Sequence, residues 1–431
     1  MLIDRRKFAA VSAAGIMRGF AANDRIQVGV IGTGARSQEL MQALHAQPGV
    51  EIAAVADAYT GRVQRTLERY GKKLRVMATH TQLLEDKSLD AVIVATPDHW
   101  HKDIVIRAVK AGKDVYCEKP LTFRSSEGME IVRAAAEAKR IVQVGSQGIS
   151  TASQQKAKEM IRGGKLGRVT MIRAAYNRNT ASGAWIYPIP PDASPKTVNW
   201  DLFQGPAPKR QFNLERFFRW RCYEDYSGGI ATDLFVHLCT TIHYLMDAKA
   251  PSRVMGMGQL YRWTKSRDVP DTLNAILEYP EGFTVNLSST FNNQFAADSS
   301  FQFLGTEGTI TLGDGMTFHP ENAMEDNRWI VESWPEKLER EYYQNPKVRE
   351  AELPATWKAR LRPAVEQFRQ VGVDSTHTHI ANWLDAIRTR KPVYEDALTG
   401  HRAAACAHMV NLSVKQKRAV EWDFQKEDIR S

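Results

Sequence analysis

Lys119 is placed where a side chain of its type could take part in catalysis. It follows the short apolar run Val115–Cys117 and precedes Pro120, a residue that cannot continue strand pairing. In an open parallel sheet, ligands bind at the carboxyl ends of the strands. A lysine there, beside Glu118, can donate a hydrogen bond to a substrate oxygen. Taken alone, however, the segment is more typical of a solvated lysine at the end of a strand.

Asp233 and His237 form a second candidate pair. They are four positions apart in Ile230–Met246, where most other side chains are apolar, so we predict a buried helix with both residues on one face. A buried carboxylate and a buried imidazole need partners. The two could satisfy each other, or Asp233 could anchor a loop. The independent placement of Lys119 favours a third interpretation, in which both face a bound ligand.

A glycine-rich turn indicates what that ligand includes. The predicted strand Ile26–Ile31 is followed by the pattern G-x-G-x-x-S and then by a helical run. Gly32 permits a tight turn, and Gly34 lets backbone amides approach a pyrophosphate at the start of the helix. Ser37, in the third position, is small enough to pack the helix on the strand. The pattern is weak alone but lies here between a strand and a helix, as nucleotide binding requires.

Asp57 follows the apolar run Glu51–Ala56, about 20 residues beyond the glycine-rich turn. An acid there can accept hydrogen bonds from both ribose hydroxyls of a dinucleotide. Its charge would repel a 2′-phosphate, so NAD is favoured over NADP, although Arg62 lies nearby. The alternative is that Asp57 caps a helix that begins near Thr60.

Two further strands are expected to end at the same edge of the sheet. The strand Asp90–Ala95 leads into Thr96 and Pro97, which we assign to the cofactor site together with Glu118. The last strand of the set begins at Ile141 and leads into Gln147, which we assign there as well. Repeated βα units of this kind imply a parallel sheet with helices on both faces.

Trp100 and His101 follow directly in the predicted loop after Pro97. Both could line a nicotinamide pocket. Equally, Trp100 could belong to the core, and His101 could be a satisfied polar group in the first turn of a helix.

The second half alternates apolar and polar residues over 169–177 and 251–302, which predicts an antiparallel sheet that includes a hairpin, Thr272–Tyr279 with Phe283–Leu287. Tyr176 and Asn177 end its first strand and could reach substrate hydroxyls. Residues 314–353 show no clear period. Residues 379–388 and 400–414 predict closing helices.

Residues 183–221 are too long for an ordinary connection and are rich in proline, tryptophan and basic side chains. We interpret them as an insertion that covers a pocket. Arg219, Trp220 and Arg221 could contact a sugar there, although a surface loop without that role fits the pattern equally well.

Composition narrows the class of protein. The chain has 431 residues, of which 43% are hydrophobic and 25% charged, with a formal net charge of +9. Basic residues are scattered among acidic ones, so we expect no nucleic-acid interface. No apolar run approaches the ~20 residues of a membrane span. The four cysteines show no C-x-x-C spacing, and we predict no metal site.

The N-terminus predicts a separate segment. Arg5, Arg6 and Lys7 precede the small, mildly apolar run Ala9–Met17, which resembles a twin-arginine export signal. A basic tail is the alternative, and the pattern of a folded domain begins at Arg25. We expect a periplasmic or exported protein, or a cytoplasmic one if residues 1–24 are only a flexible tail.

Beyond this tail, the motifs together resemble one family. They are Gly32-x-Gly34, Asp57, Thr96-Pro97, Glu118-Lys119-Pro120, Val144-Gly145, the glycine-rich segment Ser227–His237, and Gly305–Thr309. In this order and spacing they look like the Gfo/Idh/MocA family of NAD(P)-dependent sugar oxidoreductases. The specific part of the resemblance is Glu-Lys-Pro combined with the downstream Asp-x-x-x-His.

The resemblance implies both a fold and a catalytic group. The expected fold is α/β, with a Rossmann doubly wound parallel sheet in residues 25–150. Residues 151–431 would form an α+β substrate domain with an open, mainly antiparallel sheet that often serves as an oligomer interface. The catalytic group would be Lys119, Asp233 and His237. Phe235 departs from the family, since many members have glycine there, which leaves the shape of the pocket open.

The expected reaction is hydride transfer between NAD and a hydroxyl-bearing carbon of a sugar or cyclitol. His237 would be the general base, Lys119 would stabilise charge on the oxygen, and Asp233 would orient or tune them. If the protein is exported, little free NAD is at hand. A redox-neutral glycosidase with tightly held NAD is therefore the alternative. A sugar- or nucleotide-binding protein without catalysis is the third possibility.

Overall fold

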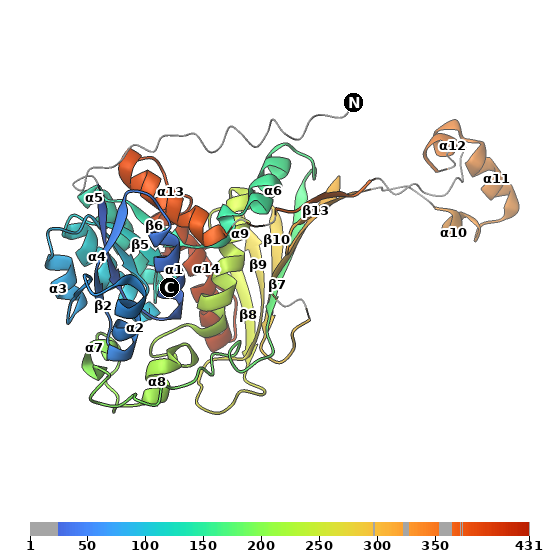
Figure 1. Ribbon diagram of the computed structural model, residues 1–431. Helices are drawn as coiled ribbons and strands as arrows, with labels where there is room; N and C mark the ends of the chain where they lie inside the picture. The colour runs from blue at the N-terminus through green and yellow to red at the C-terminus, as the bar shows by residue number, and fades with distance from the viewer. Residues whose placement is uncertain are drawn as a thin grey trace.

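The computed structural model describes residues 25–295, 298–321, 327–352, 364–370, 372 and 374–430. The predicted export signal, residues 1–24, lies outside the described residues. Two sheets stand side by side with helices between and around them (Figure 1). Within the described ranges, no helix is long and apolar enough to cross a membrane.

The first sheet is parallel throughout, as predicted, with the strand order β3-β2-β1-β4-β5-β6. Its strands are short and almost wholly apolar because helices cover both faces. They are β1 (Ile26–Ile31), β2 (Val50–Ala56), β3 (Arg75–Val76), β4 (Ala91–Val94), β5 (Asp114–Glu118) and β6 (Val142–Gly145). The helices that alternate with them are α1 (Ala35–His45), α2 (Thr60–Tyr70), α3 (His80–Glu85), α4 (His101–Lys110) and α5 (Gly128–Ala138).

The second sheet has ten strands in the order β14-β13-β12-β11-β7-β10-β9-β8-β15-β16. Among the strands of the described residues, only β7 and β10 pair in parallel, so the predicted, mainly antiparallel sheet is confirmed. Its strands are β7 (Val169–Asn177), β8 (Arg253–Gln259), β9 (Thr272–Tyr279), β10 (Phe283–Thr290), β11 (Asp298–Gly305), β12 (Gly308–Leu312), β13 (Met316–Pro320), β14 (Glu366–Phe368), β15 (Val420–Asp423) and β16 (Asp428–Ile429). The predicted hairpin is β9–β10, with Tyr279 opposite Phe283.

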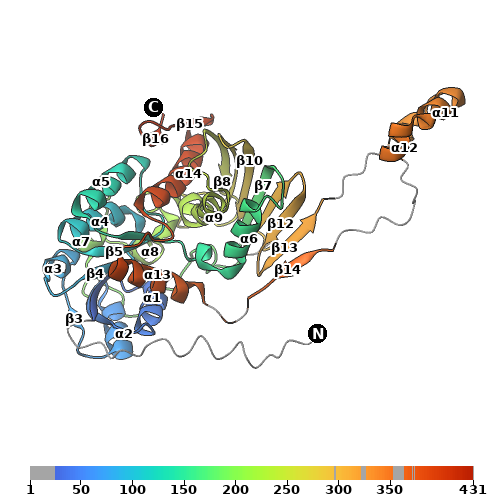
Figure 2. The ribbon, with the colours of Figure 1, turned by 90° about the horizontal axis from the view of Figure 1, so that it is seen from above.

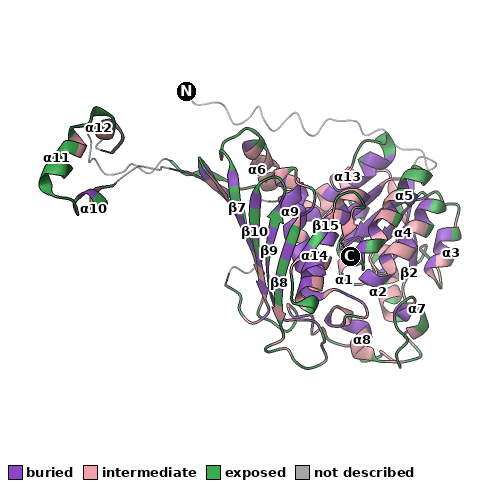
Figure 3. Cartoon of the chain, turned by 180° about the vertical axis from the view of Figure 1, so that it is seen from behind, coloured by how far each residue is buried: buried purple, intermediate pink, exposed green. Residues whose placement is uncertain are grey.

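One face of this sheet is covered and the other is open. The helices α6 (Ala152–Arg162), α9 (Val236–Met246) and α14 (Ala397–Gln416) pack on the inner face. Along β9 and β10, buried and exposed residues alternate strictly, which is the period-two pattern of a sheet with a single covered face (Figure 3).

The predicted closing helices return to the first sheet. Helix α13 (Ser375–Thr389) packs against α1, and its Ile380, Trp383 and Leu384 share a core with β1 and β4. Helix α14 contacts both α5 and α9, so it bridges the two halves of the molecule. These contacts fix the edge of the first sheet relative to the second half.

The expectation of irregular structure over 314–353 is corrected. The segment contains β13 of the second sheet and the helices α10 (Arg328–Val331), α11 (Glu336–Gln344) and α12 (Pro346–Glu352). The three helices lie apart from both sheets (Figure 1), and Figure 2 shows the same for α11 and α12. Helix α11 is largely charged, and pairs such as Arg340 with Glu336 support it along its surface. With little apolar surface to bury, these helices carry too weak a periodic signal to be predicted.

Candidate active site

A cleft of about 950 Å³ lies where the first sheet meets the second half of the molecule. The turns after β1, β2, β4 and β5 form one wall, and the 183–221 insertion with the segment before α9 forms the other. The insertion contains α7 (Trp200–Gln204) and α8 (Leu214–Phe218). The predicted site residues that line the cleft are Gly32, Gly34, Ser37, Asp57, Thr96, Pro97, Trp100, Glu118, Lys119, Gln147, Tyr176, Trp220, Asp233 and His237.

The structure places three predicted site residues outside the cleft lining. His101 is buried, and its two ring nitrogens lie 2.6 Å from the Pro120 carbonyl oxygen and 3.0 Å from that of Thr96, so it supports the cleft wall from behind. Asn177 donates to the Phe295 carbonyl at 2.6 Å and accepts from Thr290 N at 3.1 Å. Its amide is therefore engaged at the end of the sheet, outside the lining of the cleft.

Arg219 is likewise turned away from the cleft. It donates to the Tyr187 carbonyl at 3.0 Å and pairs with Glu215 at 3.0 Å. Its neighbours Trp220 and Arg221 do line the cleft. The path of the insertion could not be predicted from composition, and it alone decides which of three successive side chains points inward.

Sequence analysis missed Arg178, Asp98, Arg36 and Tyr187, which also line the cleft. A signal for Arg178 was present, since it is two positions beyond Tyr176 at the end of a strand and so shares its face. Asp98 directly follows the predicted Thr96-Pro97 loop. Tyr187 lies in the insertion and carries no comparable signal.

The glycine-rich turn fits a pyrophosphate. Gly32 has a φ of +84°, and a Cβ there would lie 2.6 Å from the Ala95 carbonyl oxygen, so only glycine fits. Gly34 is the N-cap of α1 and has no side chain to bond the free amides of the first helical turn. A Cβ at Gly34 would meet nothing closer than Arg62 at 3.8 Å. These amides are thus open to an anion at the helix N-terminus.

Asp57 holds the turn in place. Its carboxylate accepts from the backbone N–H of Thr33 at 2.6 Å and of Tyr59 at 2.8 Å, and Arg62 Nη1 lies 3.8 Å away. Tyr59, and not Asp57, is the N-cap of α2, so the predicted capping alternative is wrong. A carboxylate has about four acceptor positions, so Asp57 can still accept from a ribose hydroxyl in the cleft.

Lys119 and Asp233 meet across the cleft. Lys119 directly follows β5, and the peptide bond between Lys119 and Pro120 is cis. The Nζ of Lys119 donates to Asp233 Oδ1 at 2.8 Å and to the Asp233 carbonyl at 2.9 Å. Arg221 Nε donates to the same Oδ1 at 2.9 Å. An ammonium has three N–H donors, so one N–H of Lys119 remains for a ligand.

The helix that carries Asp233 and His237 differs from the regular helix we expected. Residues Ala231–Phe235 form a wide π turn, and α9 begins only at Val236. The wide turn accompanies the hydrogen bond from Lys119 to the Asp233 carbonyl, and an inserted side chain is a known cause of such turns. His237 still lines the same cleft, about one turn beyond Asp233.

Electrostatics separate the protonation states of these groups. Burial alone would raise the pKa of Asp233, but Lys119 and Arg221 outweigh it and hold that pKa well below its usual range. Burial, with the positive charge of Lys119, lowers the pKa of His237 to about 3. At neutral pH the site therefore contains a carboxylate and an uncharged imidazole. Burial raises the pKa of Asp98 to about 7 against the opposing effect of Arg221 and Lys119.

Comparison with known proteins identifies the family. Residues 26–146 match a profile described as "Oxidoreductase family, NAD-binding Rossmann fold", and residues 158–422 match its "C-terminal alpha/beta domain". The inositol 2-dehydrogenase/D-chiro-inositol 3-dehydrogenase of Shouchella clausii is 25% identical over 323 residues, which are 74% of this chain and 80% of that protein. The NAD(+)-dependent scyllo-inositol 2-dehydrogenase of Bacillus subtilis is 25% identical over 62% of this chain and 67% of its own length.

Solved structures agree in fold. A levoglucosan dehydrogenase in complex with NADH and levoglucosan superposes with a TM-score of 0.68 at 18% identity, over 92% of this chain and 99% of that one. GenD2 from gentamicin A biosynthesis, in complex with NAD, gives 0.66 at 19% identity, over 95% and 99%. The two matched profiles together span almost all of the chain after its N-terminal tail, and the chain belongs to the Gfo/Idh/MocA oxidoreductase family.

Proposed function

We propose that this oxidoreductase is an NAD-dependent dehydrogenase that transfers a hydride between nicotinamide and a hydroxyl-bearing carbon of a sugar or cyclitol. The observation that carries the proposal is the meeting of Lys119, Asp233 and His237 in the cleft that also contains the glycine-rich turn. The names of the relatives and of the superposed structures, which act on inositols and levoglucosan, support this class of substrate.

Each residue has a distinct role in the proposed reaction. Bound NAD would supply the hydride acceptor at its nicotinamide ring. The uncharged imidazole of His237 accepts the hydroxyl proton as general base. The remaining N–H of Lys119 bonds the same oxygen and stabilises the negative charge that develops there. Asp233, ionised and bonded to Lys119, fixes the direction of that N–H.

The preference for NAD over NADP is part of the proposal. Asp57 would accept from the ribose hydroxyls, and its charge would repel a 2′-phosphate. Arg62 lies close enough to weaken that repulsion, so the preference should be measured as the ratio of kcat/KM for the two cofactors. Glu118 and Gln147 bond each other at 3.1 Å beside this region, and we propose that they line the nicotinamide end.

The experiment that tests the function is a screen of sugars and cyclitols with the purified full-length protein and NAD, read at the absorbance of NADH. Reduction of NAD that depends on one of these substrates is the expected result. Retained cofactor together with aryl-glycoside cleavage, and without net NADH, would instead establish the redox-neutral glycosidase. Binding of NAD with no turnover of any substrate would favour a binding protein.

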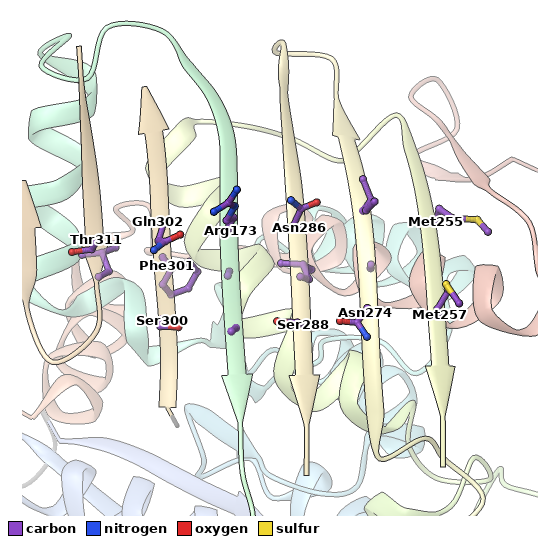
Figure 4. Close-up of a pocket in the computed structure, with 16 residues that line it drawn as sticks. Arg173, Met255, Met257, Asn274, Asn286, Ser288, Ser300, Phe301, Gln302 and Thr311 are labelled. Carbon is purple, nitrogen blue, oxygen red and sulfur yellow. The ribbon is translucent and has the colours of Figure 1, made fainter. Parts of the chain in front are cut away.

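We further propose that the protein is a homo-oligomer joined through the open face of the second sheet. A shallow groove of about 640 Å³ runs over this face, lined mostly by uncharged side chains (Figure 4). Met257 is 73% exposed and Ile276 is 60% exposed there. Apolar side chains on a face with so few charges are typical of a surface that another subunit covers. We also propose that residues 1–24 direct the protein out of the cytoplasm.

A further inference from the structure

Three cationic side chains meet at the substrate end of the cleft. Lys119 comes from the end of β5, Arg178 from the residue after β7, and Arg221 from the insertion. All three line the cleft and surround the carboxylate of Asp233, which bonds Lys119 and Arg221 directly. The chain thus brings these charges together from three separate elements.

The acidic groups of the cleft do not balance them. Arg36 engages Glu118 at 2.9 Å and also pairs with Glu39, and Asp57 faces Arg62, so these groups compensate one another away from Asp233. Asp233 and Asp98 are left to face three cations, and Asp98 is only partly ionised at neutral pH because burial raises its pKa to about 7. Among the groups around Asp233, at least one positive charge is therefore in excess, and the oxidised nicotinamide ring would add another.

The two arginines also retain hydrogen-bonding capacity toward the cleft. Arg221 donates to Asp233 through Nε, and its guanidinium lies 4.2 Å from the centre of the Trp220 ring, which fixes its plane. Arg178 lies 4.8 Å from the centre of the Tyr176 ring and has a long, 3.4 Å contact with the Gly183 carbonyl. A guanidinium offers five N–H donors, so most of each fork is available to a ligand.

We propose that the substrate is an anionic sugar, with its carboxylate or phosphate held by Arg178 and Arg221 while Lys119 bonds the reacting hydroxyl. The inference rests on the proposed dehydrogenase function and narrows its substrate class. Planar guanidinium forks match the oxygen spacing of both anions and bind them in two-pronged fashion. A neutral sugar would leave the excess charge uncompensated in a largely enclosed site.

An anionic substrate would also help the proposed base. The cations that lower the pKa of His237 are Lys119, Arg36 and Arg178, which act in addition to burial. A bound carboxylate or phosphate offsets part of this positive charge and so raises the proton affinity of His237. An anionic substrate would thus make His237 a stronger base for its own proton, whereas an uncharged ligand would leave the proton affinity of His237 unchanged.

The test compares matched substrates in the full-length enzyme with NAD. The pairs are glucose with glucuronate, galactose with galacturonate, and glucose with glucose 6-phosphate, and both binding by calorimetry and kcat/KM are measured. We expect one anionic member to exceed its neutral partner by roughly ten-fold or more, the effect of one charge-assisted hydrogen bond. Comparison of the two uronates with glucose 6-phosphate shows whether the site prefers a carboxylate or a phosphate. Added KCl should weaken the binding of the anion only.

Two variants locate the effect. Arg178→Gln should remove most of the preference for the anion while it leaves the binding of NAD unchanged. Arg340→Gln makes the same change of net charge at a surface ion pair on α11 and should leave the preference intact.

Two outcomes separate this inference from the proposed function. Turnover of neutral sugars with no preference for their anionic partners would overturn the inference and leave the dehydrogenase standing. Tight binding of an anion that Arg178→Gln abolishes, without any NADH formed, would support the charge inference and contradict the proposed reaction.

Discussion

Asp233 is the residue on which the others in the cleft depend. It accepts from both Lys119 and Arg221 through one oxygen, and its backbone carbonyl accepts a second hydrogen bond from Lys119. Replacing Asp233 would leave two enclosed cations without their partner, at a cost of about 3–5 kcal/mol for a buried pair. Its effect on activity would therefore mix catalysis with stability, and a less central residue is the better probe of the electrostatics.

Asp98 offers such a probe. In the folded protein its pKa is about 7, well above that of an aspartate in an unfolded chain, and Lys119, Arg221 and Asp233 are the charged groups around it. The native state therefore holds this proton more tightly, and the stability it provides is present below about pH 4 and is lost as pH rises to about 7. Asp98→Asn should gain stability relative to wild type between pH 5 and pH 8, by about 2–3 kcal/mol, because each pH unit below the folded pKa is worth about 1.4 kcal/mol. Urea unfolding at both pH values measures the difference, and a pH-independent difference would contradict the assignment.

Site residues could be predicted from the sequence where they lie at the end of a predicted strand or at helical spacing on one face of a predicted helix. Lys119, Asp233 and His237 were selected from strand ends and helical spacing, and the structure brings all three to one cleft. The hydrogen bonds of the Asn177 amide with Phe295 and Thr290 depend on tertiary pairing, which spacing does not encode. The charge excess around Asp233 depends on tertiary contacts alone.

In the turn between β1 and α1, one glycine is needed for the stability of the fold and another for the binding of a ligand. Gly32 and Gly34 are two positions apart, yet a side chain at each meets a different environment. At Gly32 a Cβ would collide with the Ala95 carbonyl at a positive φ, whereas at Gly34 it would point toward open space beside Arg62. The first glycine serves the fold of the turn, and the second serves the approach of a ligand.

These two glycines give a matched pair of variants. Gly32→Ala should destabilise the protein, because a residue forced into this backbone region costs about 1–3 kcal/mol before the steric contact is counted. Gly34→Ala should leave thermal stability nearly unchanged and weaken NAD binding at least roughly ten-fold, because the methyl group stands between the helix amides and the pyrophosphate. Thermal unfolding and NAD calorimetry measure the two effects. Equal behaviour of the two variants would contradict the role assigned to the turn.

Elements were predicted well where burial imposes a period. The strands of the first sheet, the β9–β10 hairpin and the helices α13 and α14 all follow from apolar runs or alternation. The π turn before α9 was missed, and it coincides with a hydrogen bond from Lys119, 114 residues earlier in the chain, which local periodicity does not reveal. Helices α10–α12 were missed because they bury little.

At the scale of the whole molecule, the open face of the second sheet is the feature that a single chain leaves unexplained. Arg173 is a rare charge among the side chains that line its groove, and the remainder are small, amide-bearing or apolar (Figure 4). The bridging by α14 holds this sheet and the first sheet in a fixed relation, so assembly through the outer face would leave the cleft open.

Met257 tests the proposed assembly. Met257→Glu introduces a charge into the proposed interface, on its β8 side, and should convert the oligomer to monomers at micromolar concentration, because an unpaired buried charge is strongly unfavourable. Leu338→Glu, at a 50% exposed position on α11, makes the same kind of change away from the sheet and should not alter the assembly. Light scattering coupled to size exclusion measures the mass. A wild-type monomer would contradict the proposal.

The most direct test of the account as a whole is a single-turnover measurement on Lys119→Ala. The wild-type enzyme and the variant are each mixed with NAD and the best substrate of the screen in a stopped-flow instrument, and NADH formation is followed by absorbance. We predict that Lys119→Ala binds NAD with an unchanged Kd but forms NADH at least about a thousand-fold more slowly, since it lacks the donor to the reacting oxygen. NADH formation at the wild-type rate in this variant would contradict the central claim.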